Sequence, residues 1–386
     1  MRTSAFVYPW DVIGDPDAAH RIAALGVQQV TLAAAYHSTR ALTPRHPRHR
    51  VVTAEHASVL YPVDERRWPE TGLRPYAAGD WAPGDAWGEA AAALADAGLD
   101  VHTWVVLAHN SRLGAEHPDT SVVNAYGDRY PWAPCIARPA IRDHLVALAA
   151  EAATRPGARG TELESLGWYG LAHLHAHDKT GGVGLGEAGQ YLMSLCFCPD
   201  CRAGYAQHGL DAEELSRSVR TALEPVWRGD TADDGWAGVE KLLGAEQAAA
   251  TRAHRDATAR GLQEAAVAAV REAAPAGFQV LLHADPVSYH CGANAGVDPA
   301  HILSVADGVV VPCTGGAGLL APFAAQGRGV LAANLTVVRG MGGSPGTLAA
   351  DARAARELGA GELRLYHAGL ASDADLELVT AALAEL

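Results

Sequence analysis

The stretch from Gly160 to Cys201 reads GTELESLGWYGLAHLHAHDKTGGVGLGEAGQYLMSLCFCPDC. It begins with a short acidic strand, continues through a turn that holds aromatic residues and glycine, and ends in a Cys-x-Cys-x-x-Cys group. Carboxylates at a strand end are suited to acid–base chemistry, and closely spaced thiols are suited to binding a metal. We therefore expect the first half of this stretch to hold a reacting centre and the second half to fix the shape of its loop.

Short apolar runs alternate with helical patterns on both sides of this stretch, which is typical of βα units around a parallel sheet. The predicted strands lie at residues 5–9, 27–35, 101–108, 161–166, 277–284, 308–312, 329–335 and 362–367. Helical patterns begin at Asp15-Pro16 and recur at residues 85–97, 140–154, 212–227, 236–274, 298–306, 317–326, 345–358 and 373–385.

Eight strands with helical partners, ending in a helix, predict a (β/α)8 TIM barrel that forms a single domain over residues 1–386. Long insertions are expected after strands two, three and four, at about residues 38–85, 109–139 and 167–275. A doubly wound sheet is the alternative, because strand order cannot be read from sequence. The first strand is not followed by G-x-G-x-x-G, which argues against the dinucleotide-binding form of that fold.

The composition is that of a folded globular chain, with 49% hydrophobic and 19% charged residues. A formal charge of -14 argues against binding to nucleic acid or to an anionic membrane surface. The N-terminus has no apolar segment of signal-peptide length, and no later run approaches ~18 uninterrupted apolar residues. We therefore expect a cytoplasmic protein whose partner is a small molecule, and homo-oligomerisation remains compatible with the sequence.

Two acidic side chains in the fourth predicted strand are candidates for catalysis. Alternation places Glu162 and Glu164 on one face, which points inward because helices cover the outside of a barrel. His283 and Asp285 form a similar pair at the end of the fifth strand. Glycoside hydrolysis needs two carboxylates, one as acid and one as base or nucleophile. We predict Glu164 as general acid/base and Asp285 as its partner, with Glu162 as an alternative.

Each of these carboxylates also has a structural interpretation. Burying a carboxylate costs several kcal/mol unless it is paired or solvated, so Glu162 is equally a candidate for an anchor bonded to an arginine inside the barrel. Asp285 precedes Pro286 and is suited to capping the turn there.

Aromatic, histidine and amide side chains at strand ends and in loops are candidates for binding a sugar. Sugar rings stack on aromatic faces, and such side chains line most small-molecule pockets. The alternative is that many of them simply pack the long loops. Three alternating histidines, His173, His175 and His177, are suited to metal ligation or to contact with substrate hydroxyls. The predicted substrate-binding residues are Trp10, Tyr36, His37, His109, Trp168, Tyr169, His177, Lys179, His283, Asn334 and His367.

Three cysteines within six residues, Cys196, Cys198 and Cys201, are too close for two disulfides and are natural ligands for tetrahedral zinc. Cys135 lies in the loop before the fourth strand, where it can approach the loop after that strand. We predict these four cysteines as the ligands of a structural Zn²⁺. Reduced thiols or a redox pair are the alternative.

The same residues resemble the family 42 β-galactosidases. The resemblance covers about residues 130–205, where a cysteine in PWAPCIARPA is followed by an acidic strand and by C-x-C-x-x-C with Arg202 and Tyr205 behind it. It implies a catalytic (β/α)8 barrel, a zinc site formed by the four cysteines, and Glu164 as acid/base.

This sequence departs from that family in two places. Leu163 precedes Glu164 where the family has Asn, and the seventh predicted strand ends in Asn334 where the family has its nucleophilic Glu. The trimerisation domain that follows the barrel in that family is also absent from this sequence. The double-displacement mechanism of the family therefore does not transfer directly.

The sequence thus predicts a zinc-containing glycoside-hydrolase-like barrel that acts on a sugar-containing small molecule. One alternative is a metal-dependent barrel enzyme, such as a sugar isomerase or hydrolase, with a catalytic divalent ion held by His and carboxylates. Another is a barrel that binds carbohydrate without catalysis, which the missing carboxylate on the seventh strand favours.

Overall fold

The computed structural model describes residues 1–386 with the exception of residues 71, 175–176 and 234. Eight parallel strands form a closed barrel, because β1 pairs with both β2 and β14. The barrel strands are β1 (Arg2–Val7), β2 (Gln29–Tyr36), β6 (Asp100–Val106), β9 (Gly160–Glu164), β10 (Gln279–Asp285), β12 (Gly308–Pro312), β13 (Val330–Thr336) and β14 (Glu362–Tyr366). The chain is therefore a (β/α)8 TIM barrel, as the sequence predicted, and its strands lie within three residues of the predicted bounds.

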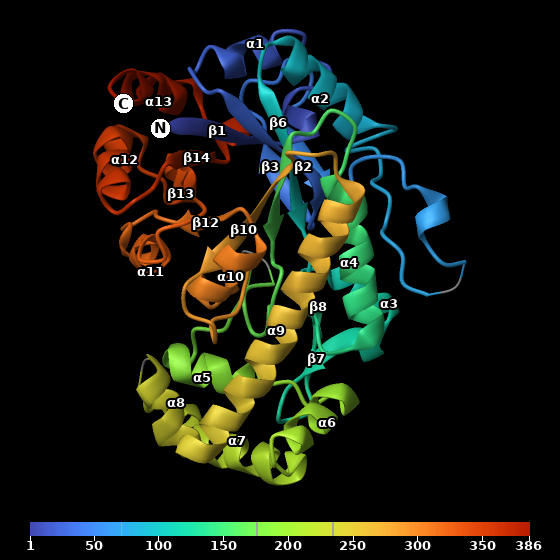
Figure 1. Cartoon of the computed structure of the whole chain (residues 1–386), viewed down its shortest axis with the longest axis vertical. Helices are drawn as coiled ribbons and strands as arrows, with labels where there is room; N and C mark the ends of the chain where they lie inside the picture. The colour runs from blue at the N-terminus through green and yellow to red at the C-terminus, as the bar shows by residue number, and fades with distance from the viewer. Residues whose placement is uncertain (71, 175–176, 234) are drawn as a thin grey trace.

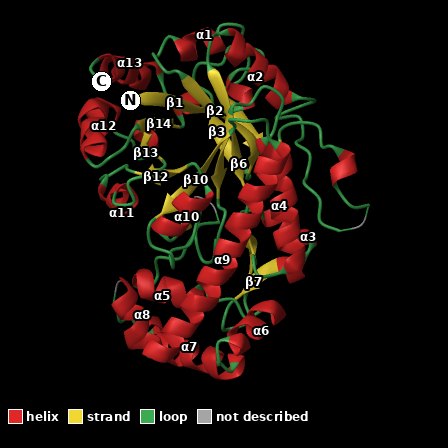
Figure 2. Cartoon of the chain, in the orientation of Figure 1, coloured by secondary structure: helices red, strands yellow, loops and turns green. Residues whose placement is uncertain are grey.

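Helices surround the barrel in the order expected for βα units (Figure 2). Several begin at side-chain caps that are visible in the sequence, such as Asp85, which accepts a hydrogen bond from the Gly88 amide. The helices outside the barrel are α1 (Ala18–Ala23), α2 (Ala86–Asp96), α4 (Pro139–Ala153), α9 (Ala245–Ala273), α10 (Pro299–Val305), α11 (Ala321–Ala324), α12 (Leu348–Glu357) and α13 (Asp373–Ala384).

The predicted helix at 236–274 is in fact two helices. The break falls at Gly244, whose φ of 78° is a left-handed conformation that a helix interior does not allow. The first segment, α8 (Gly235–Leu243), belongs to the insertion after β9, and the second is the long helix α9.

The insertions after β2, β6 and β9 contain regular structure of their own. The first holds the hairpin of β3 (Thr39–Leu42) and β4 (Val51–Ala54) and the short β5 (Ser58–Val59). The second holds α3 (Ser111–Glu116) and the hairpin of β7 (Ser121–Val123) and β8 (Arg129–Pro134), and a short β11 (Ala295–Gly296) follows β10. The insertion after β9 forms a separate helical lobe from α5 (Gly186–Met193), α6 (Pro199–Gln207), α7 (Ala212–Trp227) and α8.

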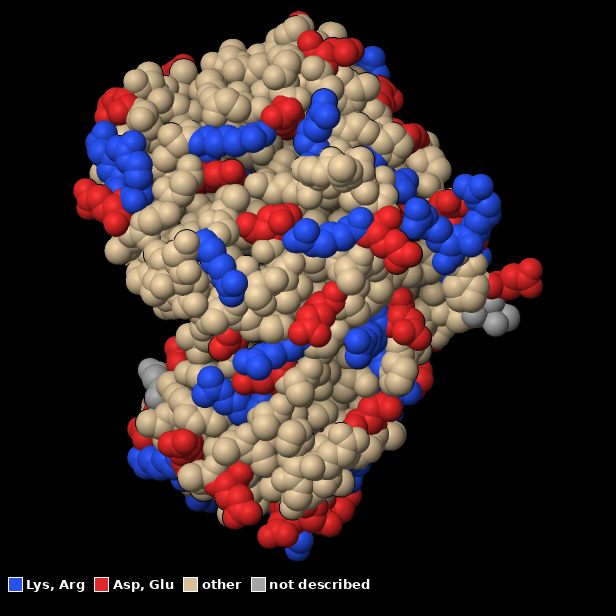
Figure 3. All heavy atoms as spheres, in the orientation of Figure 1, with Lys and Arg blue, Asp and Glu red and all other residues tan. Residues whose placement is uncertain are grey.

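Figure 1 shows this helical lobe beside one end of the barrel, with α9 running from the lobe back along the barrel wall next to α4. Acidic and basic side chains are interspersed over both lobes on the face in Figure 3. Within the part of the chain that the structure describes, no helix combines the length and the apolar character needed to cross a membrane.

The interior of the barrel contains a buried polar network. The Arg364 guanidinium Nε donates to Oε1 of Glu162 over 2.5 Å, and both side chains are fully buried. The Thr31 hydroxyl also donates to this Oε1, at 3.1 Å, and lies 2.9 Å from the Ser4 hydroxyl. Burial by itself would raise the pKa of Glu162, but the charge of Arg364 and the neighbouring His283 overcome this effect and lower it to about 2. Glu162 therefore has the surroundings of a structural anchor.

We predict that Arg364→Met lowers the free energy of unfolding by about 3–5 kcal/mol, because it leaves the Glu162 carboxylate buried without its counterion. Urea denaturation measures this change. Arg2→Met is the matched control, since Arg2 pairs with Asp100 on the surface, where the two side chains are 42% and 49% exposed. That exposed pair should contribute no more than about 1 kcal/mol. Equal effects of the two substitutions would contradict the anchoring role.

Candidate active site and metal centre

Glu164 lies at the carboxyl end of β9, inside the barrel mouth. Its Oε2 accepts a hydrogen bond from the Trp104 indole nitrogen at 2.7 Å. The imidazole of His283, on the neighbouring strand β10, lies between the two glutamates: its Nε2 is 3.4 Å from Glu162 Oε2, and its Nδ1 is 3.9 Å from Glu164 Oε2. The alternation expected from sequence thus places Glu162, Glu164 and His283 together inside the barrel.

The two glutamates have opposite electrostatic surroundings. Burial raises the pKa of Glu164 above its ordinary value, and the partly compensating influences of His283 and Trp104 do not cancel this effect. Glu162, two residues earlier, has its pKa lowered by Arg364. Pairs of carboxyls whose pKa values are driven apart are typical of acid–base sites. The surroundings of Glu164 therefore favour its protonated form, whereas those of Glu162 favour the ionised form.

Two residues beside this mouth have an unusual backbone. Ser165 (φ 57°) follows the end of β9, and His367 (φ 61°) follows the end of β14. Among the described residues they are the non-glycine residues with positive φ, a conformation that costs roughly 1–2 kcal/mol. Such strain concentrates at functional sites, which supports placing the site at this end of the barrel.

Aromatic rings form a continuous series around the mouth. Trp10 stacks on Tyr8 with ring centroids 4.6 Å apart, and Tyr8 donates a hydrogen bond to the Tyr36 hydroxyl at 3.0 Å. Tyr36 stacks on His37, His37 meets His109 edge to face, and His109 stacks on Tyr169 at 4.2 Å. His367 joins this series through its Nδ1, which lies 3.1 Å from the Tyr8 hydroxyl. The structure therefore gathers the predicted residues Trp10, Tyr36, His37, His109, Tyr169 and His367 at one site.

The histidines of this rim are held in the neutral form. Burial lowers the pKa of His37 to about 4, of His109 to about 2 and of His367 to about 3. A neutral imidazole offers one hydrogen-bond donor and one acceptor. This combination suits sugar hydroxyls, which also donate and accept.

Two rim and wall residues were missed by the sequence analysis: Tyr8 and Trp104. Tyr8 follows Phe6 at a spacing of two, and Trp104 lies on the same face of its strand as Val106, so their inward orientation could have been read from strand alternation. Tyr366 contacts Trp104 across the barrel with ring centroids 5.7 Å apart, a contact that local sequence does not reveal.

The other predicted substrate contacts do not belong to this series of rings. Trp168 is buried, and its indole donates to the Arg255 backbone oxygen at 3.0 Å, so it packs against α9. His177 and Lys179 lie in an exposed loop, where the Lys179 ammonium donates to the His177 backbone oxygen. Asn334, at the end of β13, is buried, and its Oδ1 has no hydrogen-bond partner within the described chain. His175, from the same histidine run, is outside the described residues.

Asp285 lies further out on β10, at the side of the helical lobe. One carboxylate oxygen accepts from the Val287 amide at 2.8 Å, and the other is 3.0 Å from Nδ1 of His290. It lines a cavity of about 220 Å³, and a neighbouring cavity of about 600 Å³ shares Glu187 and Gln190 with the first. The second cavity reaches His173, which lies 3.2 Å from the Tyr169 hydroxyl. Asp285 thus borders a cavity on the side of the helical lobe, and the neighbouring cavity reaches His173 beside Tyr169.

The four predicted cysteines come together in a buried cluster. The Cys135 sulfur is 3.6 Å from that of Cys198 and 3.5 Å from that of Cys201, and all four ligand atoms, including Cys196, lie within 4.8 Å of one another. Four thiolates around a tetrahedral Zn²⁺ with bonds of roughly 2.3 Å require sulfur separations in this range. The amides of Val123 and Cys198 both point at the Cys196 sulfur from 3.4 Å, as outer hydrogen bonds to metal-bound thiolates do. These residues therefore fit a metal ion.

The cluster joins two insertions that are far apart in the sequence. Cys135 follows the hairpin after β6, whereas the other three cysteines lie around the start of α6, in the insertion after β9. The Phe197 amide also donates to the Val123 backbone oxygen at 2.6 Å, which reinforces the junction. Among the described residues, this is the one group of three or more His, Cys, Asp or Glu side chains arranged as metal ligands.

The solved structures that share this fold include those of several glycoside hydrolases. An α-L-fucosidase, isoenzyme 2, from Paenibacillus thiaminolyticus matches 100% of this chain and 49% of its own, at 13% identity and a TM-score of 0.59. The catalytic domain of a β-amylase from Paenibacillus polymyxa matches 99% of this chain and 97% of its own, at 12% identity and a TM-score of 0.56.

A GH42 β-galactosidase from G. stearothermophilus, solved as a catalytic mutant, matches 100% of this chain at 12% identity and a TM-score of 0.53, with 56% of its own length covered. This chain thus spans about half the length of the fucosidase and the galactosidase. No family model matches the sequence, and no curated protein does so either. At these identities the likeness shows the fold alone, a (β/α)8 barrel.

We predict that the purified protein contains about one zinc per chain and that Cys135→Ser reduces its zinc affinity by more than about 100-fold, because it removes one of four ligands. Metal analysis after dialysis against a mild chelator measures this loss. Cys313→Ser is the control, since Cys313 is buried outside the cluster and should leave the zinc content unchanged. Full zinc occupancy in the Cys135 variant would contradict the assignment.

The opposite pKa shifts of the two glutamates predict opposite pH dependences of stability. A carboxyl with a raised pKa destabilises the fold once the pH exceeds its ordinary value near about 4. Glu164→Gln should therefore gain stability relative to the wild type as the pH rises above about 4. Glu162→Gln should lose stability relative to the wild type as the pH rises from about 2 to 5, because the ionised Glu162 stabilises the fold. Urea denaturation across this range tests both trends, and parallel curves for the two variants would contradict them.

Proposed function

We propose that this protein is a glycoside hydrolase that cleaves a glycosidic bond in a small sugar-containing substrate, with Glu164 as the general acid. The observation that carries this proposal is the buried Glu164 carboxyl at the barrel mouth, whose pKa is raised and which lies beside His283. A carboxyl with a raised pKa keeps its proton to higher pH than a free carboxyl does, and the protonated form can donate to the leaving oxygen of a glycoside. The glycoside hydrolases that share this fold agree with this chemistry.

Glu162 and His283 would support Glu164 without touching the substrate. Arg364 keeps Glu162 ionised, and this fixed negative charge disfavours ionisation of Glu164 nearby. The His283 ring between the two carboxyls fixes their separation and offers a path for returning the proton after each turnover.

Asp285 would be the second carboxylate. It borders a cavity on the side of the helical lobe, from which it would activate a water molecule. Its hydrogen bond to His290 would hold the carboxylate in one orientation.

The rim would bind the sugar itself. Stacked rings such as Tyr169 and His109 offer flat faces to the C–H surfaces of a pyranose. The neutral His37 and His367 can donate to hydroxyls and accept from them. The unpartnered Oδ1 of Asn334 is a ready acceptor for one further hydroxyl.

A zinc ion held by Cys135, Cys196, Cys198 and Cys201 would be structural. Four thiolates complete a tetrahedral site, so the ion would supply no open position for substrate or water. Its role would be to hold the insertion after β9 against the hairpin after β6.

A barrel that binds carbohydrate without catalysis is the second candidate. The observation that favours it is Asn334, since the end of β13 carries an amide in the place where the family 42 resemblance implies a nucleophile. A catalytic metal enzyme has less support, because the described residues gather no second set of three ligands beside the cysteines.

We predict that Glu164→Gln lowers kcat/KM on an activated aryl glycoside by about 10²- to 10⁴-fold, the usual contribution of a general acid–base group. The wild-type rate should fall as the pH rises through the raised pKa of Glu164, because the acid form is then lost. The measurement is a pH–rate profile over a panel of aryl glycosides, with circular dichroism to confirm folding.

Glu272→Gln is the control, since Glu272 is exposed on α9 and carries the same change of charge. An active Glu164→Gln variant would overturn the role of Glu164. Saturable sugar binding with no turnover on any glycoside would instead support the non-catalytic barrel.

A further inference from the structure

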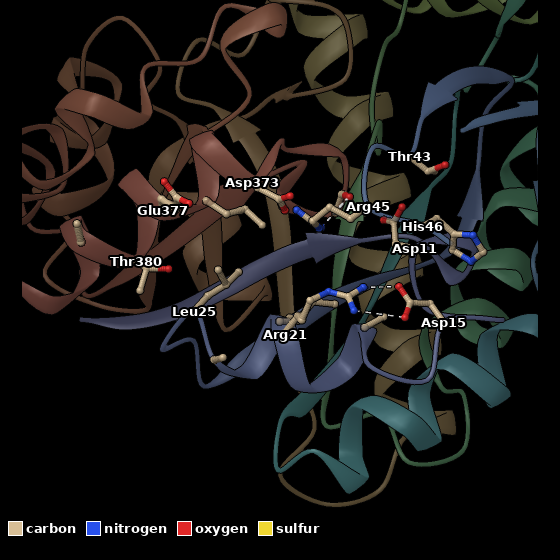
Figure 4. A pocket seen from close by; sticks show the side chains of 16 residues that line it. Asp11, Asp15, Arg21, Leu25, Thr43, Arg45, His46, Asp373, Glu377 and Thr380 are labelled. Atoms are coloured by element: carbon tan, nitrogen blue, oxygen red, sulfur yellow. Dashed lines mark hydrogen bonds and ion pairs between the residues drawn. The ribbon is translucent and has the colours of Figure 1, made fainter. Parts of the chain in front are cut away.

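A cavity of about 610 Å³ lies outside the barrel, between α1 and α13 (Figure 4). The short α1, which has 6 residues, bounds it on one side, and α13, which has 12, bounds it on the other. The chain between β1 and α1 forms a 3-10 helix at Pro9–Asp11 and turns, and Asp11 and Asp15 from this segment line the cavity. The loop after β3 closes one end of this opening, through Thr43, Arg45 and His46.

The walls of the cavity are mainly apolar. Ile22 and Leu25 line it from the α1 side, and Leu376 and Ala381 line it from α13. A volume of this size falls within the roughly 300–1,000 Å³ range of small-molecule sites, which combine apolar walls with a few placed polar groups.

The charges around the cavity are not balanced. Four carboxylates and two guanidinium groups line it, so the formal balance is negative: Asp11, Asp15, Asp373 and Glu377 against Arg21 and Arg45. Arg21 forms an ion pair with Asp15. Burial raises the pKa of Asp11 to about 7, and even with this carboxyl half protonated the balance at neutral pH stays negative.

Arg45 does not supply a free positive charge for an anion. Its guanidinium donates to the backbone oxygens of Ala371 at 2.7 Å and of Gly369 at 3.1 Å, and the Asp11 and Asp373 carboxylates stabilise its charge. Asp373 and Glu377 lie one turn apart on the exposed side of α13, both at the edge of the cavity. The charge at the opening is therefore complementary to a cation.

We propose that this cavity binds a small amphipathic cation, with its apolar body between α1 and α13 and its ammonium group facing Asp373 and Glu377. The apolar walls would supply most of the affinity, and the rim carboxylates would select for positive charge. The site is separate from the barrel mouth, and this inference does not depend on the proposed hydrolase activity.

Isothermal titration of the full-length protein tests this proposal with three probes that share one chain length: n-octyltrimethylammonium, n-octanol and n-octanoate. We expect the ammonium compound to bind with a stoichiometry of one and at least tenfold more tightly than the alcohol. Octanoate should bind more weakly than the alcohol, because the rim repels its charge.

Two sets of variants locate the binding. The double variant Asp373→Asn, Glu377→Gln should weaken binding of the ammonium compound by about tenfold and leave the alcohol unchanged. Glu385→Gln is the matched control, because it removes one charge just beyond the same helix and outside the cavity. Ala381→Phe places a large ring in the cavity from an exposed helical position, and it should weaken both probes by at least tenfold.

Equal affinity for the alcohol and the ammonium compound would contradict selection for positive charge. Tighter binding of octanoate than of the ammonium compound would show selection for negative charge instead. Absence of saturable binding, or binding that Ala381→Phe leaves unchanged, would overturn the site itself. Circular dichroism of each variant confirms that a loss of binding is not a loss of fold.

Discussion

The buried ion pair between Glu162 and Arg364 is the interaction on which the rest of the barrel interior depends. The two residues lie on β9 and β14, which are four strands apart in either direction around the closed sheet, so the pair spans the full width of the barrel. Neither charge can be buried alone without a large cost. Once β9 is held in this way, Glu164 and its neighbours at the mouth have a fixed place.

The same pair sets the electrostatics of the mouth. A glutamate whose pKa is lowered lies two residues before one whose ionisation burial opposes, and His283 lies between them. Two identical side chains on one strand thus have pKa values shifted in opposite directions, because one has a cation beside it and the other has aromatic rings. This difference favours a proton on Glu164 over a proton on Glu162.

Sequence reasoning reached the barrel and the cysteine set because both depend on local spacing. Apolar runs of strand length alternate with capped helices, and Cys196, Cys198 and Cys201 fall within six residues of one another in the sequence. Contacts between distant segments were harder to predict: an arginine partner for Glu162 was expected, but nothing local singles out Arg364. Helices α5 and α6 were also missed, because short segments rich in glycine, proline and cysteine lack a helical apolar period.

The cysteine cluster has a consequence for how the chain folds. Cys135 precedes β9 and Cys196 follows it. A metal bound to both would therefore close a loop of the chain that contains this strand. Closing such a loop removes conformational entropy from the unfolded ensemble, to an extent that grows only slowly with loop length. Metal binding would then restrict the conformations of the strand that carries both glutamates early in folding, before its distant partner β14 has been synthesised.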